Sequence, residues 1–438
     1  MRLRSLRSFE LLSSNIDLAN SLPESWTNFT GKYASIEPFN NVTAPVSTFA
    51  GRRGFLKRVH WALQECSSNR PLNSRITALV GFGGTGKSEV ARKLVSVYSQ
   101  TYTKVAWIDA TMESTADQSF MQIAALVSLP DCKKFAGKEL AQAVYRYIQR
   151  NSDGPALFIL DNATQLSSSG NTFGIADYLP ADGTGNLPIL LITSQTREWA
   201  THAYKMVELP ELSQEERIQF LQYTFRLSDV ELRKDSELGG LIEKLCEQLP
   251  GHSQTLTLVA SNIPYTPGTS SLETLKDALD AWVQCRGYDQ VLELDAGPYV
   301  ATDYPNSILN NWNSAMKNLD RLGHVSDARL LLGILNYLPG DHFGCRVLQK
   351  VHQGVRRGLC IPSSAHSDEE IFEEALRDLH MVCLIHVEGD VRDTDAVVGV
   401  QRLIQAMVVR NITAFSQYLY TKSFLQQLWP KFYIYLLV

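Results

Sequence analysis

Residues 81–88, which read Gly-Phe-Gly-Gly-Thr-Gly-Lys-Ser, constrain this chain more than any other segment. They fit the pattern G-x-x-x-x-G-K-[ST], follow a short apolar run at residues 76–80, and open an amphipathic helix. In this order of strand, loop and helix, glycines let successive backbone N–H groups converge on phosphate oxygens, and the helix adds its positive N-terminal end. The segment therefore predicts a phosphate-binding loop that leaves a buried strand.

The residues of this loop predict a nucleotide and a magnesium ion as its ligands. We expect Lys87 to reach the β- and γ-phosphates and the Ser88 hydroxyl to ligate Mg²⁺, so ATP or ADP with Mg²⁺ is the predicted cofactor. The predicted nucleotide-binding residues in this segment are Gly81, Gly83, Gly84, Thr85, Gly86, Lys87, Ser88 and Glu89. The alternatives are a glycine-rich turn that binds no phosphate and a loop that no longer binds nucleotide.

A second motif predicts the other half of the magnesium site. Residues 156–161 form a hydrophobic run, Ala-Leu-Phe-Ile-Leu-Asp, that ends in a carboxylate. Asp161 is placed to hold the Mg²⁺ shell with Ser88, and Lys87 and Asp161 are the predicted catalytic residues. Asn162 stands where many such ATPases have a second carboxylate that polarises the attacking water, and an amide cannot act as a general base. We therefore expect slow turnover or a long-lived bound nucleotide.

Alternating apolar and helical segments extend this pattern into a domain. Runs at residues 105–109, 156–160 and 189–193 are typical of buried strands, and residues 89–98 and 140–149 are typical of helices. Strands that alternate with helices predict a parallel α/β sheet with both faces covered.

The chain changes character after residue 209, where helical patterns replace strands. Ser213 and Glu216 predict a capping box at a helix start, and the apolar runs at 381–387 and 396–400 predict a hairpin beside a helical cluster, as in a winged-helix domain. We divide the chain into an unstructured leader at 1–45, a P-loop nucleotide-binding α/β domain at 46–208, a helical domain at 209–300, a winged-helix-like domain at 301–412 and a C-terminal tail at 413–438 that begins a repeat region.

Composition narrows the possible partners and location. The chain has 41 Lys and Arg against 46 Asp and Glu, which gives a net charge of −5. We expect no nucleic-acid partner for such a weakly acidic chain. No apolar run reaches the roughly 18 residues that a membrane span needs, so we expect no membrane contact. The seven cysteines form no C-x-x-C pair, which favours a reducing, cytoplasmic location. The nine histidines have no metal-binding spacing.

With these motifs in this order, residues 46–410 resemble the NB-ARC class of signalling ATPases, within the STAND group, and are most similar to its fungal, NLR-like forms. The matching segments are Phe-Ala-Gly-Arg-Arg at 49–53, Ala-Trp-Ile-Asp at 106–109, Leu-Leu-Ile-Thr-Ser at 190–194, Leu-Pro-Glu-Leu-Ser-Gln-Glu-Glu at 209–216, Leu-Pro at 249–250 and Val-Gln-Arg-Leu-Ile-Gln at 400–405.

The resemblance implies further nucleotide contacts. Arg52 and Pro250 would bind the nucleotide, with Pro250 packed on the adenine ring, and Gln401 stands where the family has a histidine that touches the β-phosphate of ADP. The family's γ-phosphate-sensing arginine directly follows two hydroxyl residues. Here Gln195 takes that place, and the nearest arginine is Arg197.

The function that the resemblance implies is a conformational switch that closes around ADP, opens with ATP, and is reset by slow Mg²⁺-dependent hydrolysis. A protein trigger and a protein effector would be its partners. We expect this chain alone to be a monomer, because its flanks are too short for the family's sensor and effector domains. A non-hydrolysing, ADP-bound scaffold and a P-loop small-molecule kinase remain as alternatives.

Overall fold

The structure is a computed structural model of the 438-residue chain. It describes residues 39–65, 75–151, 154–168, 173–181, 187–202, 204–285, 308–322, 324–337, 343–358, 361, 367–390, 393, 395–400 and 402–410. Residues 1–38 of the expected leader, the expected tail at 413–438 and Gln401 lie outside the described residues.

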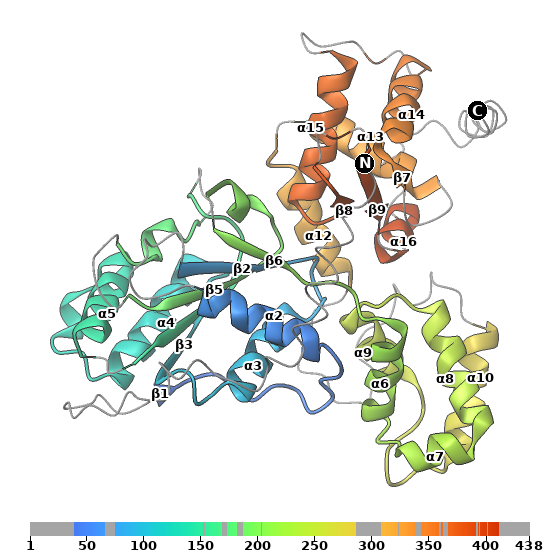
Figure 1. Ribbon diagram of the computed structural model, residues 1–438, viewed down its shortest axis with the longest axis horizontal. Coiled ribbons are helices and arrows are strands. Elements are labelled where there is room, and N and C mark those ends of the chain that lie inside the picture. The colour runs from blue at the N-terminus through green and yellow to red at the C-terminus, as the bar shows by residue number, and fades with distance from the viewer. Residues whose placement is uncertain are drawn as a thin grey trace, which may run out of the picture.

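A six-stranded sheet in the order β1-β3-β4-β5-β2-β6 forms the centre of the first part of the chain, and all of its strand pairs are parallel (Figure 1). Its strands are β1 (Phe39–Asn40), β2 (Ile76–Val80), β3 (Lys104–Asp109), β4 (Ala156–Ala163), β5 (Ile189–Ser194) and β6 (Lys205–Glu208). The predicted parallel α/β sheet is confirmed, and four of its strands coincide with the predicted apolar runs. Strands β1 and β6 were not predicted.

Helices cover both faces of this sheet, which explains why its central strands are mostly apolar. Helices α2 (Arg53–Gln64) and α3 (Lys87–Val97) pack on one face, against side chains such as Leu157 and Ile159. Helices α4 (Glu113–Leu126) and α5 (Gly137–Asn151) pack on the other face, against the alternate side chains Phe158 and Leu160. Two buried layers therefore hold β4 in place from both sides.

The α/β unit begins earlier than the predicted boundary at residue 46, which was wrong. Phe39 and Asn40 pair with Lys104 and Val105 at the sheet edge. The Asn41 side chain then exchanges two hydrogen bonds with the backbone of Trp107, at 2.7 and 3.2 Å. Backbone and amide hydrogen bonds hold this segment in place. Its sequence is therefore polar and has no apolar periodicity that would predict a strand.

A helical unit follows the sheet. It consists of α6 (Gln214–Thr224), α7 (Asp229–Lys234), α8 (Ser236–Gln248), α9 (Ser253–Asn262) and α10 (Leu272–Cys285). The predicted capping box at α6 is confirmed, because Ser213 Oγ accepts a 3.2 Å bond from Glu216 N–H and the Glu216 carboxylate accepts a 3.1 Å bond from Ser213 N–H.

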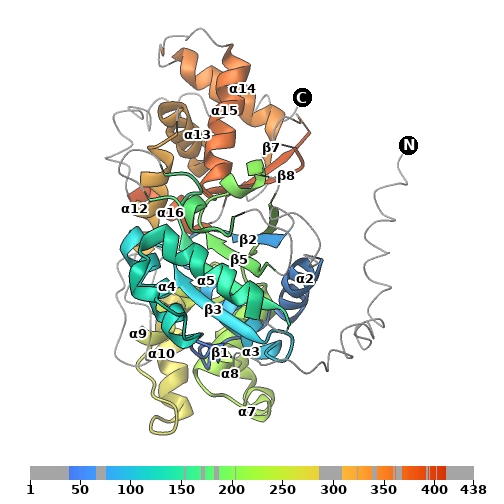
Figure 2. The ribbon, with the colours of Figure 1, turned by 90° about the vertical axis from the view of Figure 1, so that its left-hand side faces the viewer.

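A C-terminal unit combines helices with a small antiparallel sheet of order β7-β9-β8 (Figures 1 and 2). Its elements are α12 (Ile308–Leu319), α13 (Val325–Tyr337), β7 (Phe343–Gly344), α14 (Cys345–Gly358), α15 (Asp368–Met381), β8 (Ile385–Glu388), β9 (Val397–Val400) and α16 (Arg402–Arg410). The predicted hairpin is confirmed, but its first strand starts at Ile385 rather than 381, because α15 continues to Met381 and a turn follows.

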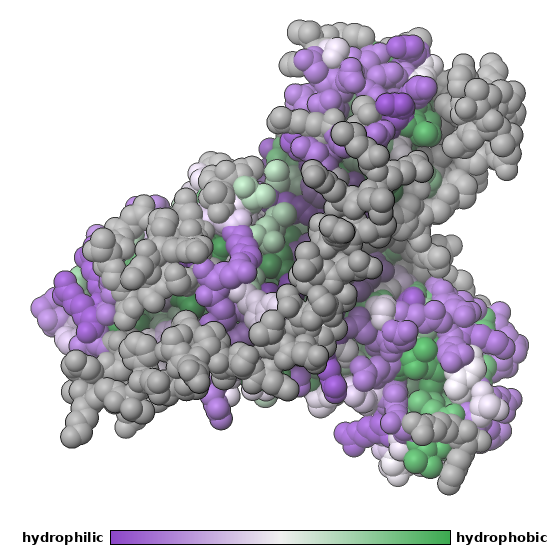
Figure 3. Space-filling model, viewed as in Figure 1, coloured by the Kyte–Doolittle hydropathy of each residue, from purple (hydrophilic) through white to green (hydrophobic). Residues whose placement is uncertain are grey.

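Hydrophilic and apolar side chains are distributed unevenly over the surface of the three units. Hydrophilic side chains dominate the outer faces of the sheet's helices and of α14 and α15, and apolar side chains gather where the sheet meets the C-terminal unit (Figure 3). Within the part of the chain that the structure describes, no helix is long and apolar enough to cross a membrane.

Candidate functional site

The phosphate loop lies at the carboxyl end of β2 and leads into α3. Gly84 and Gly86 have φ angles of +78° and +92°, in the left-handed region where a side chain strains the backbone. The Lys87 ammonium donates 2.8 Å hydrogen bonds to the carbonyl oxygens of Gly81 and Phe82. Burial lowers the pKa of Lys87 to about 8. The loop therefore curls around its own lysine.

The two predicted magnesium ligands meet beside this loop. Ser88 Oγ donates a 2.8 Å hydrogen bond to Asp161 Oδ1, and Thr193 Oγ1 donates one of 2.5 Å to the same oxygen. Burial raises the pKa of Asp161, and these two hydrogen bonds oppose that effect. The adjacent strands β4 and β5 bring Asp161 and Thr193 together at the carboxyl edge of the sheet.

This donor set fits Mg²⁺. A hydroxyl and a carboxylate are hard oxygen ligands, and Mg²⁺ in nucleotide sites takes one or two such groups and completes its shell with phosphates and water. Among the described residues, no group of three or more His, Cys, Asp or Glu side chains could hold a metal ion. Ser88 and Asp161 would supply two ligands to a magnesium ion.

Asn162 occupies a special backbone position next to Asp161. Its φ of +62° is left-handed, a conformation that Asn and Asp adopt more readily than other residues with side chains. Its N–H donates to Thr193 Oγ1 at 2.8 Å, and its side-chain amide donates to Thr111 Oγ1 at 3.1 Å. The amide thus lies at the edge of the sheet beside the predicted metal ligand. A carboxylate at this position could polarise a water molecule that attacks the nucleotide.

Two other predicted binding residues, Arg52 and Glu89, bond to segments outside the phosphate loop. Arg52 is buried, and its guanidinium donates to Pro210 O at 3.4 Å and Ser253 Oγ at 3.5 Å. Burial lowers the pKa of Arg52 to about 10. Glu89 forms an ion pair with Arg92, and its other oxygen accepts a 2.8 Å bond from Val46 N–H. Glu89 therefore anchors the segment before α2.

The start of α9 contacts the phosphate loop directly. His252 Nε2 lies 2.7 Å from Gly83 O, Ser253 Oγ donates to Thr85 O at 3.1 Å, and Gln254 N–H donates to Gly84 O at 3.1 Å. The resemblance implies that Pro250 packs on the adenine ring, and Pro250 is buried two residues before His252. Nothing in the sequence links residues 252–254 to residues 83–85, because these bonds exist only in the folded chain.

Arg197 joins the sheet to the C-terminal unit. Its backbone N–H donates to Met381 O at 2.7 Å, and its buried guanidinium bonds to the carbonyl oxygens of His380 and Ile385, the latter at 3.3 Å. The same guanidinium forms an ion pair with Glu208. The arginine nearest to the family's sensor position therefore contacts the end of α15 and the start of β8.

Cys383 lies in the turn between α15 and β8 and faces the beginning of the phosphate loop. It is buried, with a left-handed φ of +58°. Burial raises the pKa of its thiol, and the Lys87 ammonium and the Gly81 backbone oppose that shift. The C-terminal unit therefore reaches the phosphate loop through this turn.

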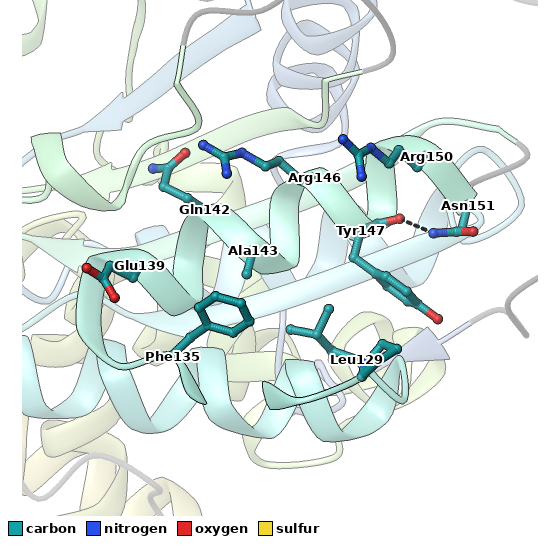
Figure 4. Close-up of a pocket in the computed structure, with 10 residues that line it drawn as sticks. Leu129, Phe135, Glu139, Gln142, Ala143, Arg146, Tyr147, Arg150 and Asn151 are labelled. Atoms are coloured by element: carbon teal, nitrogen blue, oxygen red, sulfur yellow. Dashed lines mark hydrogen bonds between the residues drawn. The ribbon is translucent and has the colours of Figure 1, made fainter. Parts of the chain in front are cut away.

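A separate cavity of about 690 Å³ lies on the outer side of α5 (Figure 4). Arg146 and Arg150 extend along one side of the helix, and Leu129, Phe135 and Tyr147 lie on the other. None of the predicted nucleotide-binding residues lines this cavity, so it is distinct from the phosphate loop.

The comparison with known proteins agrees with the phosphate-loop geometry. A family model described as an AAA domain matches residues 72–198, which include the loop, Asp161 and Arg197. The fold is that of P-loop NTPases. No curated protein matches this chain.

Several solved structures are similar to this chain at low identity. The ORC2 protein of Aeropyrum pernix, in its ADPNP–ADP complexes, is 13% identical with a TM-score of 0.46, over 88% of this chain and 100% of that chain. A Walker-type ATPase of Pyrococcus abyssi is 15% identical with a TM-score of 0.49, over 85% and 99%. A Pyrococcus horikoshii STAND protein (Signal Transduction ATPase with Numerous Domains) with a tetratricopeptide repeat sensor is 13% identical with a TM-score of 0.36, over 84% and 43%.

Proposed function

We propose that this protein is a nucleotide-dependent conformational switch of the NB-ARC signalling type, closed around ADP and opened by ATP. The observation that carries the proposal is that two further units of the chain contact one phosphate loop. His252 and Gln254 of the helical unit bond to the carbonyls of Gly83 and Gly84, and Cys383 of the C-terminal unit lies against Gly81 and Lys87. A ligand in this loop acts on both units at once.

Such contacts supply what a switch requires. A ligand shifts a conformational equilibrium only by its difference in affinity for the two states, so it must lie where those states differ. The turn that contains Cys383 lies beside Gly81 and Lys87, and Lys87 is the residue that would hold the terminal phosphate of a triphosphate. An additional phosphate there would compete with the turn, and the C-terminal unit would move away.

Hydrolysis in this proposal resets the switch slowly. Lys87 would hold the phosphates, and Ser88 with Asp161 would hold Mg²⁺, which supplies charge neutralisation at the reacting phosphate when bound. Asn162 accepts no proton from water, so the rate depends on positioning and electrostatics alone. The protein would therefore be a weak ATPase.

A scaffold that retains ADP without hydrolysis is the second candidate. Asn162 favours it, because its amide is bonded to Thr111 and no carboxylate occupies the position next to Asp161. The contacts of the helical and C-terminal units with the phosphate loop are the same in both candidates.

Nucleotide analysis combined with single-turnover hydrolysis tests the proposal. Denatured protein is expected to release ADP in near-stoichiometric amount, and preloaded ATP is expected to convert to ADP once per site at a slow, Mg²⁺-dependent rate. ADP release without any conversion of ATP would favour the scaffold. Protein that carries no nucleotide and binds none would contradict both candidates.

A further inference from the structure

The carbonyl side of the phosphate loop is held by three consecutive residues of the helical unit. Gly83, Gly84 and Thr85 each have a carbonyl that accepts a hydrogen bond from the start of α9, at 2.7, 3.1 and 3.1 Å respectively. With its carbonyl oxygens bonded outward, the loop keeps its N–H groups available for phosphate. The start of α9 thus fixes the shape that phosphate binding needs.

The hydrogen bonds of His252 identify its tautomer. His252 is the N-cap residue of α9, and its Nδ1 accepts a 3.3 Å bond from Thr255 N–H. Nδ1 therefore carries no proton in the neutral ring, so Nε2 does and donates to Gly83 O. One imidazole thus caps α9 with one nitrogen and holds the phosphate loop with the other.

The packing around these bonds leaves little room for the loop to move. An added Cβ at Gly84 would lie 2.2 Å from Gln254 Oε1 and 2.7 Å from His252 Cε1. Asn311 of α12 donates a 2.5 Å hydrogen bond to Gln254 Oε1 and lies against Gly83. His252 itself is completely buried. A shift of α9 therefore shifts the loop.

We propose that His252 is a positioning residue that couples the helical unit to nucleotide affinity, by donating its Nε2 proton to the Gly83 carbonyl. This inference rests on the proposed nucleotide site and adds its regulation. When α9 is in place the loop is preorganised and binds nucleotide tightly; when the helical unit moves away, the loop loses its support and affinity falls. By linkage, a bound nucleotide favours the docked position of α9 by the same factor.

Two substitutions separate the two nitrogens of His252. In His252→Asn, the short side chain keeps an acceptor for Thr255 N–H but has no donor that reaches Gly83. In His252→Gln, the longer amide reaches the Gly83 carbonyl with an N–H but lacks the ring nitrogen that caps α9. His352→Leu is the matched control, because His352 is an equally buried histidine in the C-terminal unit, away from the loop.

The experiment measures the Kd of fluorescent ADP and the hydrogen exchange of amides 82–88 in the full chain. We expect His252→Asn to weaken ADP binding about tenfold and to speed exchange of the loop amides, and His252→Gln to restore both to within about threefold of wild type. His352→Leu should leave the Kd unchanged whatever it does to stability.

Each other outcome has a definite meaning. Wild-type affinity in His252→Asn would overturn the inference while leaving the nucleotide site intact. Equal loss in His252→Asn and His252→Gln would also overturn it, because affinity would then follow the presence of the imidazole and not the donor to Gly83. Failure of the wild-type protein to bind ADP would instead contradict the proposed function, so the two failures are distinguishable.

Discussion

At the scale of single residues, Lys87 has the most direct role in the proposed site. Its ammonium is buried and bonds to two carbonyls of the loop that it crosses. Lys87→Ala is expected to weaken ADP binding at least tenfold, because no other group in the loop supplies a positive charge to the phosphates. Isothermal titration measures the loss.

Lys93→Ala is the matched control, since Lys93 lies on the same helix and its ammonium lies over the ring of Phe49 rather than at the loop. Equal ADP affinity in wild type and Lys87→Ala, with both variants folded, would contradict the assignment of the loop.

Asn162 gives the second prediction at this scale. Its left-handed backbone accepts Asp with little strain, so Asn162→Asp tests chemistry rather than folding. We expect the variant to hydrolyse ATP at least tenfold faster, because a carboxylate beside Asp161 can polarise the attacking water. Asp161→Ala should abolish hydrolysis. An unchanged rate in Asn162→Asp, together with loss in Asp161→Ala, would place water activation elsewhere.

At the scale of elements, Arg197 links the C-terminal unit to the sheet through hydrogen bonds and an ion pair. Glu208 of β6 pairs with Arg197 and accepts a 3.3 Å hydrogen bond from His386 of β8. Arg197→Met should weaken this contact by about 3 kcal/mol, because the two backbone carbonyls lose their donor and Glu208 keeps only its bond with His386. Faster proteolysis between the sheet and the C-terminal unit measures the effect. Arg346→Met is the control, because the Arg346 side chain on α14 is exposed.

The same contact should depend on pH. The hydrogen bond to Glu208 raises the pKa of His386 above its usual value of about 6.5. The pKa of Glu208 is lowered to about 2, because its bonds to His386 and Arg197 outweigh the effect of its burial. The stability that His386 adds to the contact between the sheet and the C-terminal unit is therefore fully present below pH 6.5. It is lost as the pH rises through the raised pKa of His386. Proteolysis should be slower at pH 6 than at pH 8, and His386→Phe should remove that difference. A pH-independent rate in wild type would contradict this account.

The helices and strands also show which parts of the fold can be predicted from the sequence. Strands β2 and β5 are fully buried, and β3 and β4 are mostly buried, so each contains an apolar run from which the sequence predicted it. Strand β6 reads Lys-Met-Val-Glu at a sheet edge, with only one buried residue, and has no apolar run to recognise. The loop, Ser88 and Asp161 were predicted because their motif is local. His252 and Arg197 act across more than a hundred residues of chain, and only the tertiary fold brings them to the site.

At the scale of the whole molecule, buried histidines predict acid sensitivity. Burial lowers the pKa of His60, His252 and His380 to about 4, whereas an unfolded histidine has a pKa of about 6.5. Between these values the unfolded chain binds more protons than the folded one. The free energy of unfolding should therefore fall as the pH drops from 6.5 towards 4, by about 1.4 kcal/mol per pH unit for each histidine.

Urea unfolding at pH 7, 6 and 5 measures this dependence. His60→Phe keeps a ring stacked on Tyr98 but removes one titrating group, so its stability should change less between pH 6 and pH 5 than that of wild type. Midpoints that do not move between pH 7 and pH 5 would contradict the prediction.

The central claim is that the nucleotide sets the position of the C-terminal unit relative to the sheet. Spin labels on unnatural amino acids at the exposed positions Val97, at the end of α3, and Val347, on α14, report that position without using native cysteines. We predict one short distance with ADP and a longer one with a non-hydrolysable ATP analogue, and no difference between the two in Lys87→Ala. Identical distances in wild type saturated with either nucleotide would contradict the account.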